Sequence, residues 1–246
     1  MSATTAHLAH QFDDAEQQFA AAELGMWLFL STEVLLFGGL FCTYSIYRLW
    51  YHAAFVAGSQ RLEQVLGTIN TAVLLTSSLS MALAVHAAQT DDRRGIVRNL
   101  VFTIFLGCMF LGIKGYEYRQ KFVEDLVPGP NFSLTADQPN DNSREGRRDK
   151  NNRAGQPPYR APSQTTLTTE PDVGRVELFF SFYFAMTGLH ALHMIVGIGM
   201  LGVLLVGASH GAFTPEYHTP VEMIGLYWHF VDIVWVFLFP LLYLIR

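Results

Sequence analysis

Two histidines inside a long apolar stretch are the residues with the most obvious chemistry. His190 and His193 are three residues apart, so a helix would place them on nearly the same face. Imidazoles at that spacing can ligate a metal ion or a haem iron. Such a site also needs ligands from a facing segment, and His86 and His229 are the only other deep candidates. Histidines in helix bundles also bond to neighbouring helices. We therefore predict polar bundle residues and no metal site.

A carboxyl group lies inside another apolar stretch. Glu33 stands about nine residues into it, or roughly 13 Å deep if the stretch is a membrane helix. Placing a charge there costs about 2.5–3.5 kcal/mol on insertion scales, so this residue needs a specific role or a partner. Two interpretations remain open. The carboxyl takes part in proton movement or contacts lipid, or it is a protonated acid bonded to a neighbouring helix.

Further polar residues are spaced for contact along one helix. His229 and Asp232 are three residues apart and could hold each other's charge or tautomer, and Glu117 follows Lys114 at the same spacing. We predict a polar network inside the bundle that comprises His86, Glu117, His190, His193, His229 and Asp232. The sequence contains no readable nucleophile–base pair or phosphate-binding loop, so we predict no catalytic residue.

The elements that position these residues are apolar and long. Half of the 246 residues are hydrophobic and only 15% are charged, against about 25% in a soluble domain. A membrane-spanning helix needs about 20 mostly apolar residues. Five segments meet that length, at about 24–47, 68–88, 97–118, 176–206 and 222–245. We predict an all-α integral membrane bundle of five transmembrane helices, with aromatic residues such as Tyr47 and Tyr243 in interfacial belts.

The polar segments divide the chain further. Residues 1–22 contain no Lys or Arg and are predicted to form a polar tail, and residues 23–246 form the membrane domain. The long polar loop 119–175 is rich in proline and charge, so it is either disordered or ordered against a partner. Cys42 and Cys108 lie in apolar runs without a CxxC pair, and we expect both to be buried. Nothing in the charge pattern suggests nucleic acid.

Several strings in these segments resemble one family. The run from Tyr227 to Phe239, Y-W-H-F-V-D-I-V-W-V-F-L-F, closely resembles the last helix of cytochrome c oxidase subunit III. The run G-M-W-L-F-L-S-T-E-V-L-L-F that begins at Gly25 resembles the family's third helix, including its embedded glutamate. I-N-T-A-V-L-L-T-S-S from Ile69, G-Y-E-Y around Glu117 and F-A-M-T-G-L-H-A-L-H ending at His193 are also similar. The resemblance covers all five helices in order.

The resemblance implies a role in aerobic respiration. Subunit III of a haem-copper oxidase carries no redox centre, so no haem or metal is expected here. It packs on subunit I, holds phospholipid in a cleft and supports proton uptake, in a complex that transfers electrons from cytochrome c to oxygen and pumps protons. Glu33 would be the family's embedded acid. The family's orientation implies a multi-pass protein of the bacterial plasma membrane, with a cytoplasmic amino terminus and the carboxyl terminus and residues 119–175 outside.

Two departures from the family pattern keep alternatives open. Longer members have seven helices, and in some systems the two that are missing here are fused to subunit I, so a longer subunit I is one expectation. The five-helix form also resembles subunits of quinol oxidases. The loop 119–175 is unusually long and could contact subunit II, a cytochrome c donor or another respiratory subunit. The alternatives are a subunit-III-like component of a quinol oxidase or nitric oxide reductase, or an independent membrane haem protein. A small transporter is a further alternative, but nothing in the sequence resembles inverted repeats or broken helices.

Overall fold

The computed structural model describes residues 10–129, 132, 173–214 and 217–245. Within these ranges the chain forms six helices and no strand. They are α1 (Ala15–Trp50), α2 (His52–Ser59), α3 (Gln64–Gln89), α4 (Arg93–Val123), α5 (Val173–His210) and α6 (Thr219–Tyr243). All except α2 are long and apolar enough to cross a membrane. The predicted all-α bundle of five transmembrane helices is therefore confirmed.

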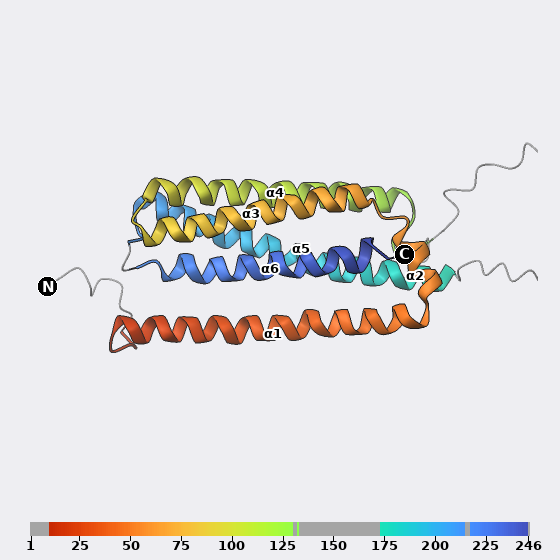
Figure 1. Cartoon of the computed structure of the whole chain (residues 1–246), viewed down its shortest axis with the longest axis horizontal. Coiled ribbons are helices and arrows are strands. Elements are labelled where there is room, and N and C mark those ends of the chain that lie inside the picture. The colour runs from red at the N-terminus through yellow and green to blue at the C-terminus, as the bar shows by residue number, and fades with distance from the viewer. Residues whose placement is uncertain (1–9, 130–131, 133–172, 215–216, 246) are drawn as a thin grey trace, which may run out of the picture.

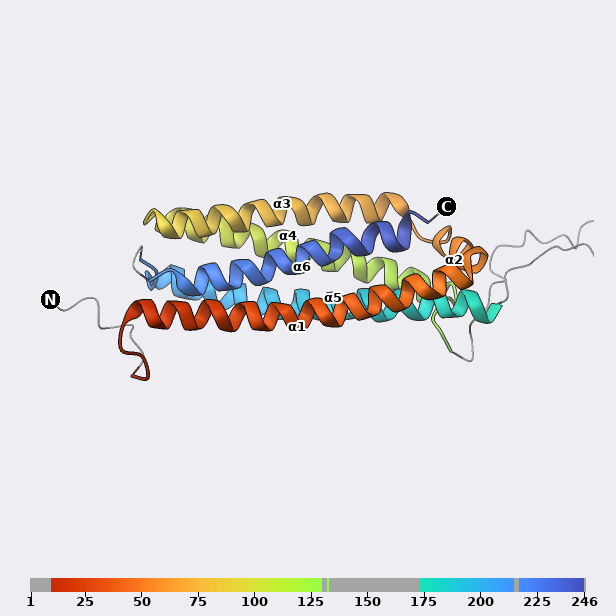
Figure 2. The same ribbon diagram turned by 60° about the horizontal axis from the view of Figure 1, so that its bottom comes forward.

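Four of the long helices form a tight bundle, and α1 lies along one side of it. The helices α3, α4, α5 and α6 pack on one another, while α1 packs chiefly on α6 and also contacts α2 and α5. Figure 2 shows α1 running along the lower edge of α5 and α6. Only Leu30, Phe37 and Tyr44 of α1 are buried, and they are seven residues apart. This helix therefore contributes a narrow seam to the core and leaves most of the rest of its surface exposed.

The helix ends are set by short-range polar contacts. Asp14 caps α1, because its side chain accepts a hydrogen bond from the backbone of Gln17 at 2.7 Å. Asp92 caps α4 in the same way through Gly95, at 3.0 Å. Asp91 before it has a φ of 58°, which turns the chain sharply between α3 and α4. Asp91 and Asp92 together fix the antiparallel α3–α4 hairpin at one end of the bundle.

Close packing in the centre depends on small residues opposite a large one. The indole of Trp228 on α6 lies against Gly107 of α4 and Gly197 of α5. A Cβ atom would come within 2.9 Å of Trp228 at Gly107 and 3.0 Å at Gly197. The same indole donates a hydrogen bond to Ser77 of α3 at 3.1 Å. Trp228 thus ties α6 to the other three helices of the bundle, so the polar residues on these helices are held at fixed levels.

The helices extend beyond the apolar segments in the sequence. Helix α1 begins at Ala15, inside the stretch expected to be a polar tail, and α4 continues to Val123, past the expected start of the polar loop. Residues 133–172 of that loop lie outside the described residues. The expectation that Cys42 and Cys108 are buried is wrong, since both thiols are exposed on the outside of the bundle. Apolar surroundings along a membrane helix include the surface that faces lipid, so hydropathy does not separate the two.

Candidate functional site

Glu33 and His193 form a pair between α1 and α5. The Oε2 atom of Glu33 lies 3.1 Å from Nε2 of His193, and each side chain is 14% exposed. The other ring nitrogen, Nδ1, lies 2.9 Å from the carbonyl oxygen of Leu189 and must donate its proton there. A hydrogen bond between Nε2 and the carboxyl then needs one further proton. With that proton on either group the pair has no net charge, which is the arrangement with the smallest cost inside a membrane.

A cleft opens beside this pair. Its volume is about 270 Å³, and it is lined by Met26, Phe29, Glu33, Leu192, His193, Val196, Met200 and Tyr227. The hydroxyl of Tyr227 donates to the backbone carbonyl of His193 at 3.0 Å, and the ring of Phe37 stands edge-on to the imidazole at 5.4 Å. These contacts fix the imidazole. The cleft therefore presents apolar walls and one neutral polar pair at the surface of the bundle, which suits an apolar chain with few polar atoms.

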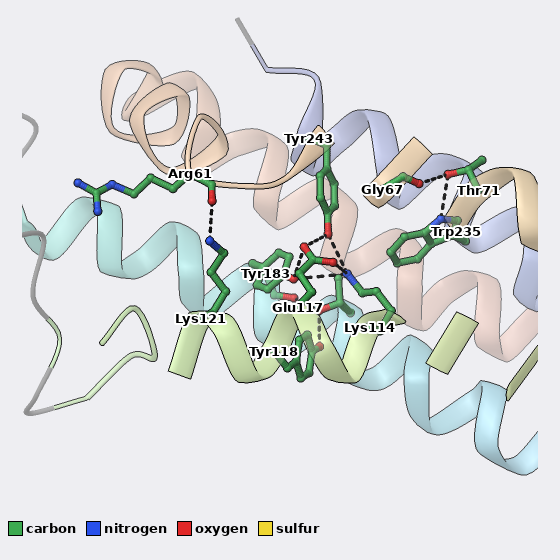
Figure 3. Close-up of polar contacts among 11 residues, drawn as sticks. Arg61, Gly67, Thr71, Lys114, Glu117, Tyr118, Lys121, Tyr183, Trp235 and Tyr243 are labelled. Atoms are coloured by element: carbon green, nitrogen blue, oxygen red, sulfur yellow. Dashed lines mark hydrogen bonds and ion pairs between the residues drawn. The ribbon is translucent and has the colours of Figure 1, made fainter. Parts of the chain in front are cut away.

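A second acid–base pair is enclosed where α4, α5 and α6 meet. Glu117 is completely buried, and its Oε2 atom accepts from the ammonium of Lys114 at 2.9 Å. Its Oε1 atom accepts from the hydroxyl of Tyr183 at 2.9 Å and from that of Tyr243 (Figure 3). Lys114 also donates to Tyr243 at 2.8 Å and lies 4.8 Å above the ring of Trp235. Every strong donor and acceptor of this cluster bonds to another group of the chain. The cluster therefore stabilises the bundle and leaves no polar group for a ligand.

One turn beyond Glu117 on the same face of α4, another buried lysine contacts the connection between α2 and α3. Lys121 donates to the carbonyl oxygen of Arg61, in the connection between α2 and α3, at 2.7 Å (Figure 3). It also pairs with Glu124 at 2.7 Å. Its side chain is only 3% exposed. This contact ties the last turns of α4, which continue past the apolar segment, to the connection between α2 and α3.

The remaining predicted residues do not form a single network. His190 is buried against the rings of Phe110 on α4 and Trp235 on α6, at 5.5 and 5.1 Å. His229 bonds to Ser78 at 2.7 Å and does not bond to Asp232. Within the described residues neither carboxyl oxygen of Asp232 has a hydrogen-bond partner.

Two interpretations from the sequence are corrected by these positions. Helical spacing alone suggested that His229 and Asp232 hold each other, but the serine hydroxyl on α3 takes the imidazole instead. His86 was predicted to lie in the polar network inside the bundle. It is exposed near the end of α3, so that prediction is wrong. His190 and His193 also have separate surroundings, since consecutive turns of α5 face different neighbours. No three metal-binding side chains gather anywhere in the described part of the chain.

Comparison with known proteins identifies the family. The family model for cytochrome c oxidase subunit III matches residues 9–136 and 175–245. The chain belongs to the cytochrome c oxidase subunit III family. The resemblance in the sequence is thereby confirmed. Members of this family are subunits of haem-copper oxidase complexes, so the chain is a multi-pass membrane protein that associates with other subunits of such an oxidoreductase.

Relatives with different electron donors in their names align over nearly the whole chain. Cytochrome c oxidase subunit 3 of Thermostichus vulcanus is 30% identical over 90% of this chain and 86% of the relative. Quinol oxidase subunit 3 of Bacillus subtilis is 27% identical, over 90% and 85% of the two chains. Cytochrome bo(3) ubiquinol oxidase subunit 3 of Pseudomonas aeruginosa is 26% identical, over 96% and 91%. Both donor classes are thus represented among proteins similar to this chain.

The tyrosine partners of the Lys114–Glu117 pair were not predicted from the sequence. Tyr243 was expected in an interfacial belt, yet it is fully buried and bonds to Glu117 and Lys114. Tyr183, 66 residues from Glu117, gave no signal of its own. The one available clue was the presence of Lys114 three residues before Glu117 in an apolar helix, since two charges at that depth require additional donors and acceptors.

Proposed function

We propose that the chain is the non-catalytic subunit III of a respiratory haem-copper oxidase, which stabilises subunit I, holds phospholipid and supports proton uptake. The observation that carries the proposal is the Glu33–His193 pair in the wall of an apolar cleft of about 270 Å³. A neutral pair at this depth offers hydrogen bonds without placing net charge in the membrane. The enclosed Lys114–Glu117 cluster, whose groups bind one another, supports a structural role for the rest of the bundle.

The proposal includes its position in the complex. Subunit I is the main partner, and no haem or copper is bound by this chain. The amino terminus and the α3–α4 turn lie on the cytoplasmic side of a bacterial plasma membrane, and the carboxyl terminus and residues 119–175 lie outside. The proposed contact of that loop is with subunit II or a cytochrome c donor. The overall reaction is proton-pumping electron transfer from cytochrome c to oxygen.

A quinol-oxidising complex is a second candidate, because quinol oxidase subunits from Bacillus subtilis and Pseudomonas aeruginosa align over most of the chain. Purification of the chain from its native membrane in mild detergent tests both. Co-purification with a haem-copper subunit I and a copper-bearing subunit II that oxidises cytochrome c supports the first candidate, and oxidation of quinol alone supports the second. Isolation of the chain without such a core, with its own haem spectrum, would overturn both.

The role of Glu33 can be tested in that same complex. Glu33→Ala should leave the initial rate of oxygen reduction nearly unchanged, while it shortens the active lifetime during turnover and reduces the phospholipid retained per complex. Thr32→Ala is the matched control, because this neighbouring side chain only bonds to the backbone of its own helix, at the carbonyl of Phe29. Loss of all initial turnover in a fully assembled Glu33→Ala complex contradicts the proposed supporting role.

A further inference from the structure

A second cleft lies between α1, α3 and α6, away from the Glu33 pair. Its volume is about 340 Å³, and it is lined by Phe19, Glu23, Ala82, Val85, Glu222, Met223, Gly225, Leu226 and His229. Because α1 and α3 both pack on α6, α6 forms the floor of a groove between them. Its lining residues come from the first parts of α1 and α6 and the last part of α3. Figure 1 shows these parts of the three helices at the end of the bundle that carries the α3–α4 turn.

The charged residues of this cleft are both acidic. Glu23 comes from α1 and Glu222 from the first turn of α6, and no Lys or Arg contributes to the lining. The carboxylate of Glu222 is held in place, since its Oε1 atom accepts from Gln89 at 2.7 Å and lies 3.2 Å from Nε2 of His218. One oxygen of a fixed carboxylate therefore remains for a ligand, beside the second carboxylate of Glu23. The rim is built to attract a cation.

The polarity of the cleft changes along its length. Glu23 and Glu222 stand where the apolar parts of α1 and α6 begin, which is the level of the membrane interface. From Glu222 to His229 the floor of the cleft follows α6 for about 10 Å into the apolar zone. Val85, Leu226 and Phe19 supply apolar walls. An occupant that matches this profile has a cationic group at one end and an apolar body that extends toward the membrane interior.

We infer that this groove binds an amine-headed phospholipid, of the phosphatidylethanolamine class, with its ammonium group between the carboxylates of Glu23 and Glu222. A lipid whose head group is purely anionic would place its phosphate beside two carboxylates with no compensating cation. A lysine or arginine side chain from a partner would reach the rim, but it would leave the apolar floor empty. The inference extends the proposed lipid-holding function to a site separate from Glu33 and assigns it a head-group class.

The test uses the purified complex with a defined lipid mixture. The complex is equilibrated with detergent micelles that contain equal amounts of phosphatidylethanolamine and phosphatidylglycerol, and retained lipid is counted by mass spectrometry. The double substitution Glu23→Gln and Glu222→Gln should reduce retained phosphatidylethanolamine at least threefold relative to phosphatidylglycerol. Glu16→Gln, in the first turn of α1 and outside the cleft, is the control and should change neither. Unchanged retention, or an equal loss of both lipids, overturns the inference.

A second measurement identifies the occupant directly. Ala82 lines the cleft and is exposed, so replacing it with a photoreactive phenylalanine derivative should not disturb the fold. Irradiation should give an adduct with the mass of phosphatidylethanolamine, which disappears in the Glu23→Gln and Glu222→Gln background. A cross-link to a partner polypeptide, or no adduct, overturns the inference. Subunit I content is measured in the same samples, so failure of the lipid site is distinguished from failure of the proposed function.

Discussion

The two acid–base pairs of the bundle have similar groups and opposite surroundings. The Lys114–Glu117 pair is closed on all sides by α4, α5 and α6, and each of its charges has several partners in the chain. The Glu33–His193 pair joins α1 to α5 at the wall of a cleft, and both side chains remain partly exposed. An ionisable residue in a membrane helix is therefore not by itself a sign of function. The number of partners already used within the chain separates a structural pair from one that is open to a ligand.

The largest effect should come from breaking the enclosed pair on one side only. Glu117→Ala leaves the Lys114 ammonium and two tyrosine hydroxyls without their acceptor, which should cost about 3–5 kcal/mol of unfolding free energy. The double variant Lys114→Met and Glu117→Gln removes the unpaired charge and should recover most of that loss. Unfolding of the purified chain in mixed micelles measures both. Equal destabilisation by the single and double variants would show that charge compensation is not the purpose of the pair.

A smaller effect is expected when one donor to Glu117 is removed and the charges stay. Tyr243→Phe deletes a hydroxyl that bonds to both Glu117 and Lys114 in the last turn of α6. We expect a loss of about 1.5–3 kcal/mol, typical of a hydrogen bond to a charged group. Tyr116→Phe on α4 is the matched control, because that side chain is exposed. If the two variants unfold alike, the carboxyl end of α6 is not held through this cluster.

The contacts that flank the segment 133–172 offer a comparison with the two pairs inside the bundle. The backbone N–H of Gly129 donates to Glu177 at 2.9 Å, and the ring of Phe132 lies 6.0 Å from that of Phe180. These contacts join the two ends of the segment 133–172, so a short glycine–serine linker in its place should leave the unfolding of the bundle unchanged. If the loop meets an electron donor, donor docking or complex assembly should weaken, as measured by KM for the donor and by subunit content. Normal values of both would remove the loop from the proposed function.

Much of the architecture could be predicted from the sequence, and the pairing inside it could not. Hydropathy and length locate the five membrane helices, because a spanning helix must be apolar over a known distance. Glu33 and His193 each stood out as costly polar residues, but 160 residues separate them and no local spacing relates them. The reverse error occurred at His229 and Asp232, where spacing suggested a contact that Ser78 on another helix replaces. Contacts between helices depend on their rotation and register, which side-chain packing sets.

Among substitutions in the two pairs, the smallest effect on stability should come from the open Glu33–His193 pair, and this prediction separates it most sharply from the enclosed one. Glu33→Gln keeps the size of the side chain, and the amide can still bond to His193. The substitution removes a group that can ionise. We expect the unfolding free energy to change by less than about 1 kcal/mol, because the pair is neutral in either form and its groups still reach the cleft. Retained phospholipid and lifetime under turnover should lie between those of the native chain and Glu33→Ala. A loss of stability as large as that of Glu117→Ala would mean that both pairs hold the fold. The Glu33–His193 pair would then be structural, and the proposed lipid-holding role of the cleft beside it would be contradicted.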